Sequence, residues 1–209
     1  MITAYITTVS ETLFDGAEGR LSEYRRDKAR RKNGAEAAAA GLLLDYALRE
    51  YGLCEREMEY IENEHGKPFF KNRPDIKFSL SHSGGYAVCV VSERNVGVDV
   101  EQHRDTKASL KIAERYFTGR EYEYVKNHRN TKTAFFRLWT KKESLLKAIG
   151  TGISGGLGAY EVLDDEITVG DTKFHFSEID GYENMSVTIC AEEIVTDIKF
   201  VTKLDFIKI

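Results

Sequence analysis

Residues 78–101, FSLSHSGGYAVCVVSERNVGVDVE, constrain the fold and chemistry of this chain more than any other stretch. Within residues 96–101, valines alternate with Gly97, Asp99 and Glu101. Side chains in a strand point to opposite faces with a period of two, so the valines are predicted to face a core while the two carboxylates share the other face. Neighbouring carboxylates repel each other unless water or a cation compensates. The stretch is therefore predicted to form half of a metal-dependent active site.

The earlier part of this stretch is polar. It is predicted to form a short turn that could hold an anion, built from Ser79, Ser81, His82, Ser83, Gly84 and Gly85. His82 has the alternative of a structural histidine, but two flanking serines and two following glycines suit anion contact better than core packing. Residues 76–80 are predicted to be a strand, and residues 86–91 and 96–100 a hairpin around 92–95.

The composition describes an ordinary soluble protein of one large or two small domains, with 209 residues, 42% hydrophobic and 31% charged. A net charge of -4 gives no reason to expect nucleic acid as a partner. Apolar runs such as 86–91 are too short to span a membrane, and residues 1–14 lack the positive charge of a signal peptide. Cys54, Cys89 and Cys190 have no metal-ligand or redox spacing, and inert thiols in a reducing cytoplasm are expected.

A dense basic cluster lies between Arg25 and Lys32. Six basic residues stand against one acid, Asp27, a local charge of +5 in a chain whose total is -4. Two interpretations remain open: a solvated helix face, and a contact with a phosphate. Most charge runs are solvated helix faces, but the contrast in sign with the rest of the chain raises the weight of a phosphate contact until the two interpretations stand level.

Two strong helices are predicted, at residues 35–51 before Gly52 and at residues 135–149 before Gly150. Each is followed at a distance by similar strands, at 88–98 and 187–200, which suggests two similar α+β halves joined just after Glu101. The remaining expected elements are strands at 2–9, 57–62, 159–163, 173–176, 186–191 and 195–204, a turn at 63–68, a helix at 110–116, and a helix begun by a capping box at 118–121.

Two carboxylates on one strand face suit Mg²⁺ or Mn²⁺, and Glu143 is the candidate for a third acidic ligand. Glu143 lies on the predicted helix 135–149, with Lys147 one turn later on the same face. The alternative is a surface Glu–Lys pair at i,i+4, worth about 0.2–0.5 kcal/mol.

Four blocks of sequence in this order resemble the Sfp-type 4′-phosphopantetheinyl transferases. They are residues 66–68 (GKP), 78–84 (FSLSHSG), 96–101 (VGVDVE) and 139–148 (WTKKESLLKA), the last followed by 150–154 (GTGIS). Each block is weak alone, but together they are highly specific. The resemblance implies two similar α/β halves related by a pseudo-two-fold axis, residues 1–101 and 102–209, with the active site in the cleft between them. It also implies a monomer rather than the trimer of the short branch.

The resemblance implies transfer of the phosphopantetheine arm from coenzyme A to a serine of an apo acyl or peptidyl carrier protein, releasing adenosine 3′,5′-bisphosphate. The metal would be Mg²⁺, with Mn²⁺ as a substitute. The carrier and its pathway stay open. Residues near 115–117 and Arg120 are candidates for carrier docking.

The same resemblance assigns roles to single residues. Asp99, Glu101 and Glu143 match the metal ligands, and Glu143 also matches the residue that deprotonates the attacking serine. Lys147 matches a lysine beside the pyrophosphate. The coenzyme A contacts would be Ser81, His82 and Lys67, with Arg25 and Lys28 at the 3′-phosphate.

Residues 37–40 depart from the family pattern, because four alanines stand where relatives often carry polar side chains. Fewer adenine-side contacts and weaker coenzyme A binding are therefore expected. Two alternatives to the transferase are a non-catalytic module that binds coenzyme A or a carrier, and a Mg²⁺-dependent nuclease. The nuclease pattern of an acid two residues before a lysine fails, because His103 stands two residues after Glu101 and Leu145 stands two residues after Glu143.

Overall fold

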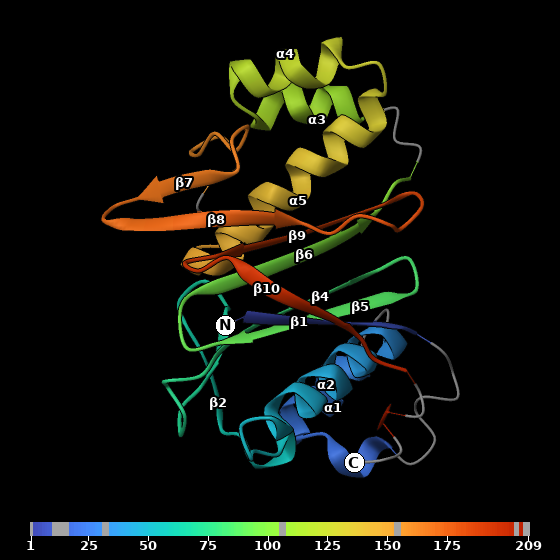
Figure 1. The fold of residues 1–209 in the computed structure, drawn as a ribbon, viewed down its shortest axis with the longest axis vertical. Coiled ribbons are helices and arrows are strands. Elements are labelled where there is room, and N and C mark those ends of the chain that lie inside the picture. Colours follow the sequence, from blue (N-terminus) through green and yellow to red (C-terminus); the bar gives the residue numbers. More distant parts are fainter. Residues whose placement is uncertain are drawn as a thin grey trace.

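The computed structural model describes residues 2–9, 17–30, 34–104, 108–152, 156–202 and 205–206. Two four-stranded sheets face each other in the middle of the molecule, and helices cover their outer faces (Figure 1). The architecture is α+β, as predicted. Among the helices in these ranges, none combines the length and apolar character needed to cross a membrane.

The first sheet has the order β10-β1-β5-β4. Its strands are β1 (Ile2–Thr8), β4 (Lys77–Ser83), β5 (Tyr86–Ser92) and β10 (Val195–Phe200), of which only β10 runs parallel to its neighbour. Helix α2 (Gly34–Arg49) packs on this sheet, and α1 (Glu23–Ala29) packs on α2. Outside the sheet lie two 3-10 turns, η2 (Ala17–Arg20) and η3 (Glu55–Glu57), and a small hairpin of β2 (Tyr60–Glu62) and β3 (Pro68–Phe70).

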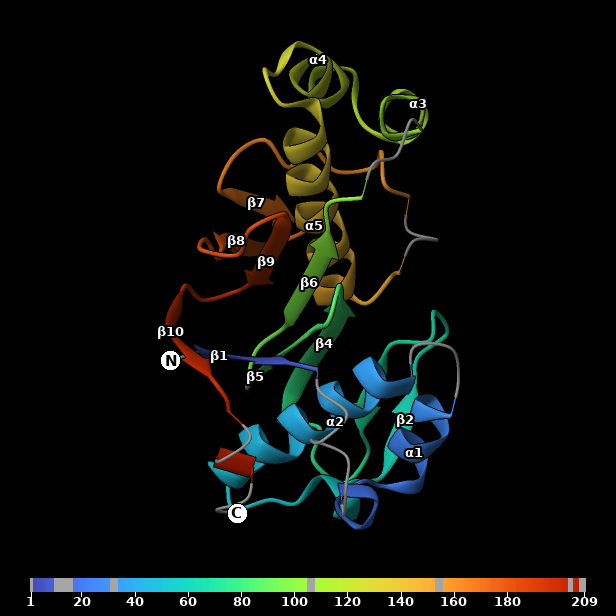
Figure 2. The ribbon, with the colours of Figure 1, turned by 90° about the vertical axis from the view of Figure 1, so that its right-hand side faces the viewer.

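The second sheet has the order β6-β9-β8-β7, with every pair antiparallel. Its strands are β6 (Val96–Gln102), β7 (Glu166–Val169), β8 (Thr172–Glu178) and β9 (Met185–Ala191). Helix α5 (Thr131–Ile149) packs on β6 and β9. Figure 2 shows α3 (Ser109–Tyr116) and α4 (Gly119–Asn127) at the end of the molecule far from α1 and α2.

Helix boundaries follow local chemistry. Thr118 and Glu121 form the predicted capping box at the start of α4. Helix α5 begins at the N-cap Asn130 and ends at Gly150, whose φ of 80° is in the left-handed region that glycine tolerates best. The predicted bounds of α2 and α5 are therefore correct to within a few residues.

Three apolar cores hold the layers together. One lies between α2 and the first sheet and another between α5 and the second sheet. The third lies between the two sheets, where Val96, Val98 and Val100 meet residues of β1, β5 and β9. The predicted alternation in residues 96–101 is confirmed, and the valine face is the face that joins the sheets.

Several local predictions were wrong. Strands β5 and β6 do not form a hairpin, because β6 pairs with β9 in the other sheet. The true hairpin partner of β5 is β4, through the two-residue turn Gly84–Gly85, where both φ values are positive (59° and 82°). The polar residues before this turn lie on the strand β4 rather than in a loop. Residues 159–163 form no strand, and β7 replaces it a few residues later.

The weak internal similarity has a counterpart in the topology. Strand β5 ends the first sheet's hairpin and leads into β6 of the second sheet, whereas β9 leads into β10 of the first sheet. The sheets therefore change over at residues 93–95 and again at 192–194, because β6 and β10 each join the sheet opposite to the strand before them. A domain join at Glu101 and a pseudo-two-fold axis stay predictions.

Candidate functional site

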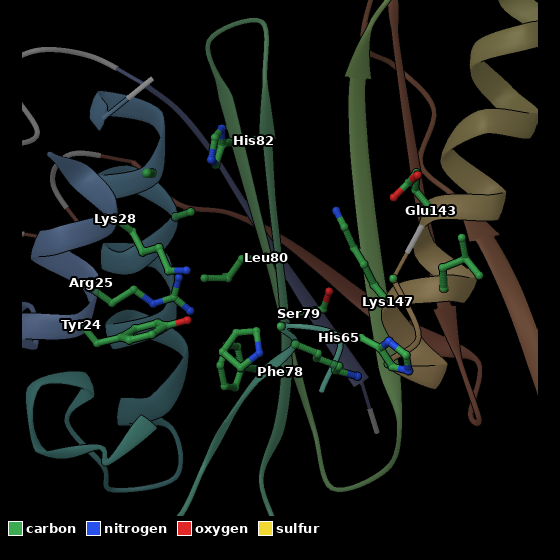
Figure 3. A pocket seen from close by; sticks show the side chains of 18 residues that line it. Tyr24, Arg25, Lys28, His65, Phe78, Ser79, Leu80, His82, Glu143 and Lys147 are labelled. Atoms are coloured by element: carbon green, nitrogen blue, oxygen red, sulfur yellow. The ribbon is translucent and has the colours of Figure 1, made fainter. Parts of the chain in front are cut away.

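A pocket of about 390 Å³ lies between helices α1 and α2 on one side and the C-terminal end of α5 on the other. Figure 3 shows its two walls: α1 and β4 contribute to one, and α5 to the other. Six residues singled out in the sequence line it: Arg25, Lys28, Lys67, His82, Glu143 and Lys147. Residues that are more than a hundred positions apart in the sequence thus share one cavity.

Strand β4 is joined to β6 by serine side chains, which form one edge of the site. The hydroxyl oxygens of Ser79, Ser81 and Ser83 accept hydrogen bonds from backbone N–H groups of β6, at 3.0 to 3.2 Å. The alternation of serines along β4 matches the two-residue repeat of the facing strand. These hydroxyls therefore align the edges of the two sheets, a role that the predicted anion-binding turn did not include.

The same serines hold the predicted acidic ligands. Ser81 donates to Oδ1 of Asp99 at 2.9 Å, and Ser83 donates to Oε2 of Glu101 at 3.1 Å. Asp99 is buried, while Glu101 is partly exposed. Ser81 and Asp99 consequently lie behind the pocket wall, whereas Glu101 lines a separate pocket of about 250 Å³ together with Phe136 and Trp139.

Lys147 connects α5 to this group. Its Nζ donates to Oδ1 of Asp99 at 2.7 Å, to the carbonyl oxygen of Val98 at 3.0 Å and to the hydroxyl of Ser81 at 3.2 Å. The close approach depends on Gly97, because a Cβ there would lie 2.0 Å from the carbonyl oxygen of Ser144 in α5. A surface Glu–Lys pair is therefore the wrong interpretation of Lys147.

Glu143 lies one turn before Lys147 in an environment that disfavours its charge. Burial, and then the repulsion of Asp99, raise the pKa of Glu143 to about 7. Burial and Asp99 also raise the pKa of Glu101. The three predicted acids therefore influence one another, as groups that share a site do.

These carboxylates have capacity left for a cation. Within the described ranges, Oδ2 of Asp99 and Oε1 of Glu143 are buried atoms without a hydrogen-bond partner. No group of three or more His, Cys, Asp or Glu side chains in those ranges is arranged to hold a metal ion as the side chains stand. The donor set is nevertheless all oxygen, negatively charged and short of partners, which fits a hard divalent cation such as Mg²⁺.

Arg25 lies at the other end of the pocket, surrounded by aromatic rings. Its guanidinium carbon is 5.3 to 5.6 Å from the ring centroids of Tyr24, Tyr60 and Phe78. Nε donates to the Tyr60 hydroxyl at 3.4 Å, and that hydroxyl donates to the buried Glu55 at 2.6 Å. Nη2 is buried with no partner among the described residues, so this cation keeps a donor for an anion.

Lys28 and Lys67 are partly occupied by protein groups. Nζ of Lys28 lies 3.3 Å from Oε1 of Glu62. Nζ of Lys67 donates to the carbonyl oxygen of Ala148 at 3.0 Å, near the C-terminal end of α5. Burial lowers the pKa of Lys67 to about 8. The predicted turn at 63–68 thus closes one side of the pocket against α5.

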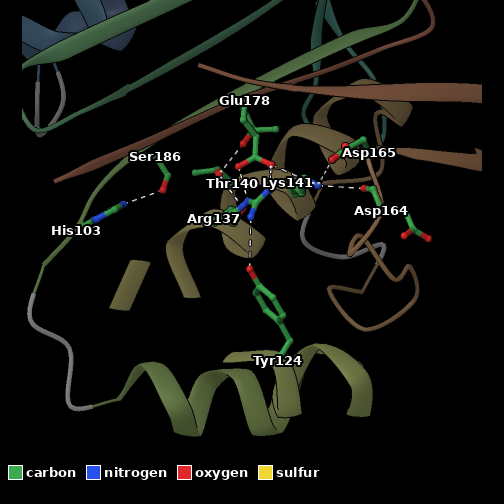
Figure 4. A network of polar contacts seen from close by, with 10 residues as sticks. His103, Tyr124, Arg137, Thr140, Lys141, Asp164, Asp165, Glu178 and Ser186 are labelled. Carbon is green, nitrogen blue, oxygen red and sulfur yellow. Dashed lines mark hydrogen bonds and ion pairs between the residues drawn. The ribbon is translucent and has the colours of Figure 1, made fainter. Parts of the chain in front are cut away.

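Other residues of the 139–148 block support the fold rather than the pocket. Figure 4 shows buried Lys141, whose Nζ donates to the carbonyl oxygen of Asp164 at 3.0 Å and to Oδ1 of Asp165 at 3.3 Å, beside the Arg137–Glu178 ion pair. Lys142 is also buried and donates to backbone oxygens of the chain after α5, at 2.7 Å. Both lysines fix the segment that follows α5.

Sequence reasoning gave no role to several residues that lie in the pocket or beside it. Tyr24 and Phe78 hold Arg25, and Tyr24 could have been found as the residue beside it. His65 lines the wall next to the GKP block. Glu36 contacts His82 and gave no signal in the sequence. Ala37 and Ala40, from the alanine run, do line the pocket and make that part of it apolar.

Together the fold and the site define an α+β protein whose pocket has basic side chains at one end and lies against a cluster of acids at the other. That is the arrangement expected for a ligand with several negative charges handled with the help of a cation. Comparisons with known proteins show which family has this fold and site.

The family model of the 4'-phosphopantetheinyl transferase superfamily matches residues 95–192. A 4'-phosphopantetheinyl transferase of Bacillus subtilis is 31% identical over 205 residues, 90% of this chain and 91% of that protein. The 4'-phosphopantetheinyl transferase Sfp of Bacillus subtilis (strain 168) is 33% identical over 149 residues, 68% of this chain and 66% of Sfp. A Thermotoga maritima holo-[acyl-carrier-protein] synthase structure overlaps 46% of this chain and 61% of its own at 18% identity and a TM-score of 0.33, too little to support an argument.

The match to the Bacillus subtilis 4'-phosphopantetheinyl transferase covers nearly the whole of both proteins and therefore decides the family. This chain belongs to the Sfp-type 4'-phosphopantetheinyl transferases. It is therefore a transferase.

Proposed function

We propose that this protein transfers the 4′-phosphopantetheine arm of coenzyme A to a serine of an apo acyl or peptidyl carrier protein. The observation that supports this most directly is the pairing of unsatisfied groups in one site. Arg25 keeps a buried donor at one end of the pocket, while Glu143 at the other end and Asp99 behind the pocket wall keep buried acceptors. Coenzyme A carries a 3′-phosphate and a pyrophosphate some distance apart, and both need compensation.

The step is a displacement at phosphorus. The carrier serine oxygen forms a bond to the phosphorus that bears pantetheine, and the bond from that phosphorus to the bridging oxygen breaks. Adenosine 3′,5′-bisphosphate leaves with the bond's electron pair, and the serine proton passes to a base. Mg²⁺, held by Asp99, Glu101 and Glu143, would stabilise charge on the pyrophosphate oxygens when bound.

Glu143 is the proposed base, acting on the serine directly or through water. Its raised pKa, about 7, suits a group that must accept a proton near neutral pH. A positioned base of this kind contributes roughly 10²–10⁴-fold to rate. Lys147 is the proposed cation beside the pyrophosphate, since its Nζ already bonds three oxygens at the edge of the pocket.

The remaining pocket residues would bind the nucleotide. Arg25 and Lys28 are the proposed 3′-phosphate contacts, and binding energy there would orient the distant reacting phosphate. Lys67, Ser81 and His82 are proposed coenzyme A contacts, of which Ser81 lies deeper than the pocket surface. One chain contributes every group in the site, so a monomer is the proposed active form.

Mass spectrometry tests the proposal. Purified protein, coenzyme A and Mg²⁺ are incubated with a panel of apo carrier proteins, and a carrier should gain the mass of one phosphopantetheine. No gain with any carrier, although coenzyme A binds, would favour a non-catalytic binding module. Asp99→Ala and Glu143→Ala should each abolish the gain, and full activity in either would remove the metal-site assignment.

Binding of Mg²⁺ has a readout that needs no carrier. A ligand that binds only the folded state raises Tm with its concentration. We expect millimolar Mg²⁺ to raise the Tm of the wild type and to leave the Tm of Asp99→Asn unchanged. Glu166→Gln, an exposed acid on β7, should respond like the wild type. Equal responses in all three proteins would contradict a site at Asp99.

A further inference from the structure

Glu36 is an acidic residue that the proposed reaction does not use, although it touches the pocket wall. It lies in the first turn of α2, where the helix dipole favours a negative charge. Its carboxylate is 19% exposed and faces the β4–β5 turn. Oε1 accepts a hydrogen bond from the N–H of Gly85 at 3.0 Å, and Oε2 lies 3.2 Å from Nδ1 of His82. Both oxygens are therefore engaged by one hairpin.

The contact determines which nitrogen of His82 carries a proton. An ionised carboxylate can only accept hydrogen bonds, so Nδ1 of His82 must be the donor. Nε2 makes no hydrogen bond within the described part of the chain, and His82 lines the pocket. The ring is thus held by one edge, and its other edge remains for a ligand.

A phosphate at Nε2 needs a donor there. With Nδ1 already protonated, Nε2 donates only when the ring carries both protons and a positive charge. A carboxylate at hydrogen-bond distance stabilises that charged form. Glu36 holds the ring by Nδ1, which leaves Nε2 as the nitrogen that can form a charge-assisted hydrogen bond with an anion.

We propose that Glu36 is a positioning residue, which holds His82 through Nδ1 so that Nε2 is presented as a donor to the phosphates of coenzyme A. The inference rests on the proposed function for the identity of the ligand. The competing role is purely structural: Glu36 ties α2 to the Gly84–Gly85 turn and has no effect on ligand binding by His82.

A double-mutant cycle separates the two roles. Coenzyme A binding is measured by calorimetry for the wild type, Glu36→Gln, His82→Asn and the double variant. The glutamine keeps the size of the side chain but loses the charge. Replacing a charge-assisted hydrogen bond by a neutral one should weaken binding about ten-fold. If Glu36 acts through His82, the double variant binds no more weakly than His82→Asn alone.

The control is Glu23→Gln, the same change in the first turn of α1 at an exposed position. Its dissociation constant should stay within about two-fold of the wild type. Unchanged binding in Glu36→Gln, or two losses that simply add in the double variant, would overturn the proposal.

Nitrogen-15 NMR of the imidazole rings gives a readout independent of affinity. The chain has five histidines, and loss of one ring signal in His82→Asn assigns His82. The wild type should show a protonated Nδ1 in the free protein and two protonated nitrogens with coenzyme A bound. Glu36→Gln should lose the doubly protonated state. An unprotonated Nδ1 in the wild type would refute the contact, and this measurement decides even if Glu36→Gln does not fold.

The two proposals can fail separately. A wild type that does not bind coenzyme A contradicts the proposed function. The protonation of the His82 ring in the free protein still tests whether Glu36 holds His82. If the wild type binds coenzyme A and transfers phosphopantetheine, and Glu36→Gln binds coenzyme A with equal affinity, only the role proposed for Glu36 is contradicted.

Discussion

At the scale of single residues, the site is held by side chains whose hydrogen bonds are almost fully used. The Ser81 hydroxyl accepts from the N–H of Val100 and from Lys147, and donates to Asp99. A small side chain thus fixes a strand edge, a cation and an acid at once. The atoms left over, Oδ2 of Asp99, Oε1 of Glu143 and Nη2 of Arg25, lie where the proposed ligands would bind.

Lys67 gives a pH dependence with a definite sign. Its pKa falls from 10.5 to about 8 in the folded state because burial disfavours the charged amine. Between these values the unfolded chain binds more protons, so the stabilisation by this residue increases with pH. The penalty is fully present below about pH 8 and disappears as the pH approaches 10.5.

We therefore compare the free energy of unfolding of the wild type with that of Lys67→Met by urea denaturation. The difference, wild type minus variant, should rise by roughly 1–2 kcal/mol between about pH 7.5 and pH 9.5. Lys71→Met, at an exposed lysine nearby, should give a difference that does not change with pH. A flat difference for Lys67→Met would contradict the burial of its amine.

At the scale of elements, the site depends on how closely α5 lies on β6. Gly97 has no side chain, and a Cβ there would lie 2.0 Å from the Ser144 carbonyl oxygen and 2.5 Å from the Ala148 nitrogen. These are backbone atoms of a helix, which cannot move aside singly. The contact places Lys147 over Asp99, so strand, helix and ion pair form one unit.

Gly97→Ala should therefore force α5 away from β6. We expect a loss of at least roughly 1–3 kcal/mol in the free energy of unfolding, the usual range for overpacking, together with loss of transfer. Chemical denaturation and the carrier assay measure the two effects. Gly119→Ala, where an added Cβ meets nothing within 4 Å, should be neutral or slightly stabilising. Equal stabilities for the two variants would show that the helix is not held so tightly.

At the scale of the whole molecule, the two sheets are interlocked. The core between them combines strands of both sheets, the serines of β4 bind the backbone of β6, and β10 crosses from the second sheet to the first. The inner apolar face of each sheet is covered by the other sheet. The molecule is therefore expected to unfold as one cooperative unit.

Core substitutions on the two sides test this cooperativity. Leu43 in α2 and Leu145 in α5 are buried in different cores. Replacement of either by alanine should lower the free energy of unfolding by roughly 2–5 kcal/mol. Both should shift the same single transition in urea, followed by circular dichroism and by the fluorescence of Trp139. Two transitions, each sensitive to only one substitution, would mean that the halves unfold separately.

Local pattern predicted those parts of the molecule that local chemistry decides. The two long helices, the capping box at Thr118 and the valine face of residues 96–101 are confirmed, since spacing and capping fix them within a few residues. The hairpin of β5 with β6 was wrong, because pairing depends on the partner and not on the strand itself. Glu36 could not be found, because a single glutamate at a helix start is ordinary until its neighbours are known.

The sequence alone determined the set of chemical groups: three acids, a lysine one helical turn from one of them, a histidine among serines, and a basic cluster. It also determined the family, because four motifs in order identify it without any coordinates. Only the tertiary structure decided how these groups meet. The crossing of β6 and β10 between sheets, and the absence of a side chain at Gly97, bring Lys147 to Asp99 across 48 residues of chain. The physical reason is that side-chain periodicity acts within an element, whereas burial and hydrogen-bond satisfaction act between elements that the sequence order does not place together.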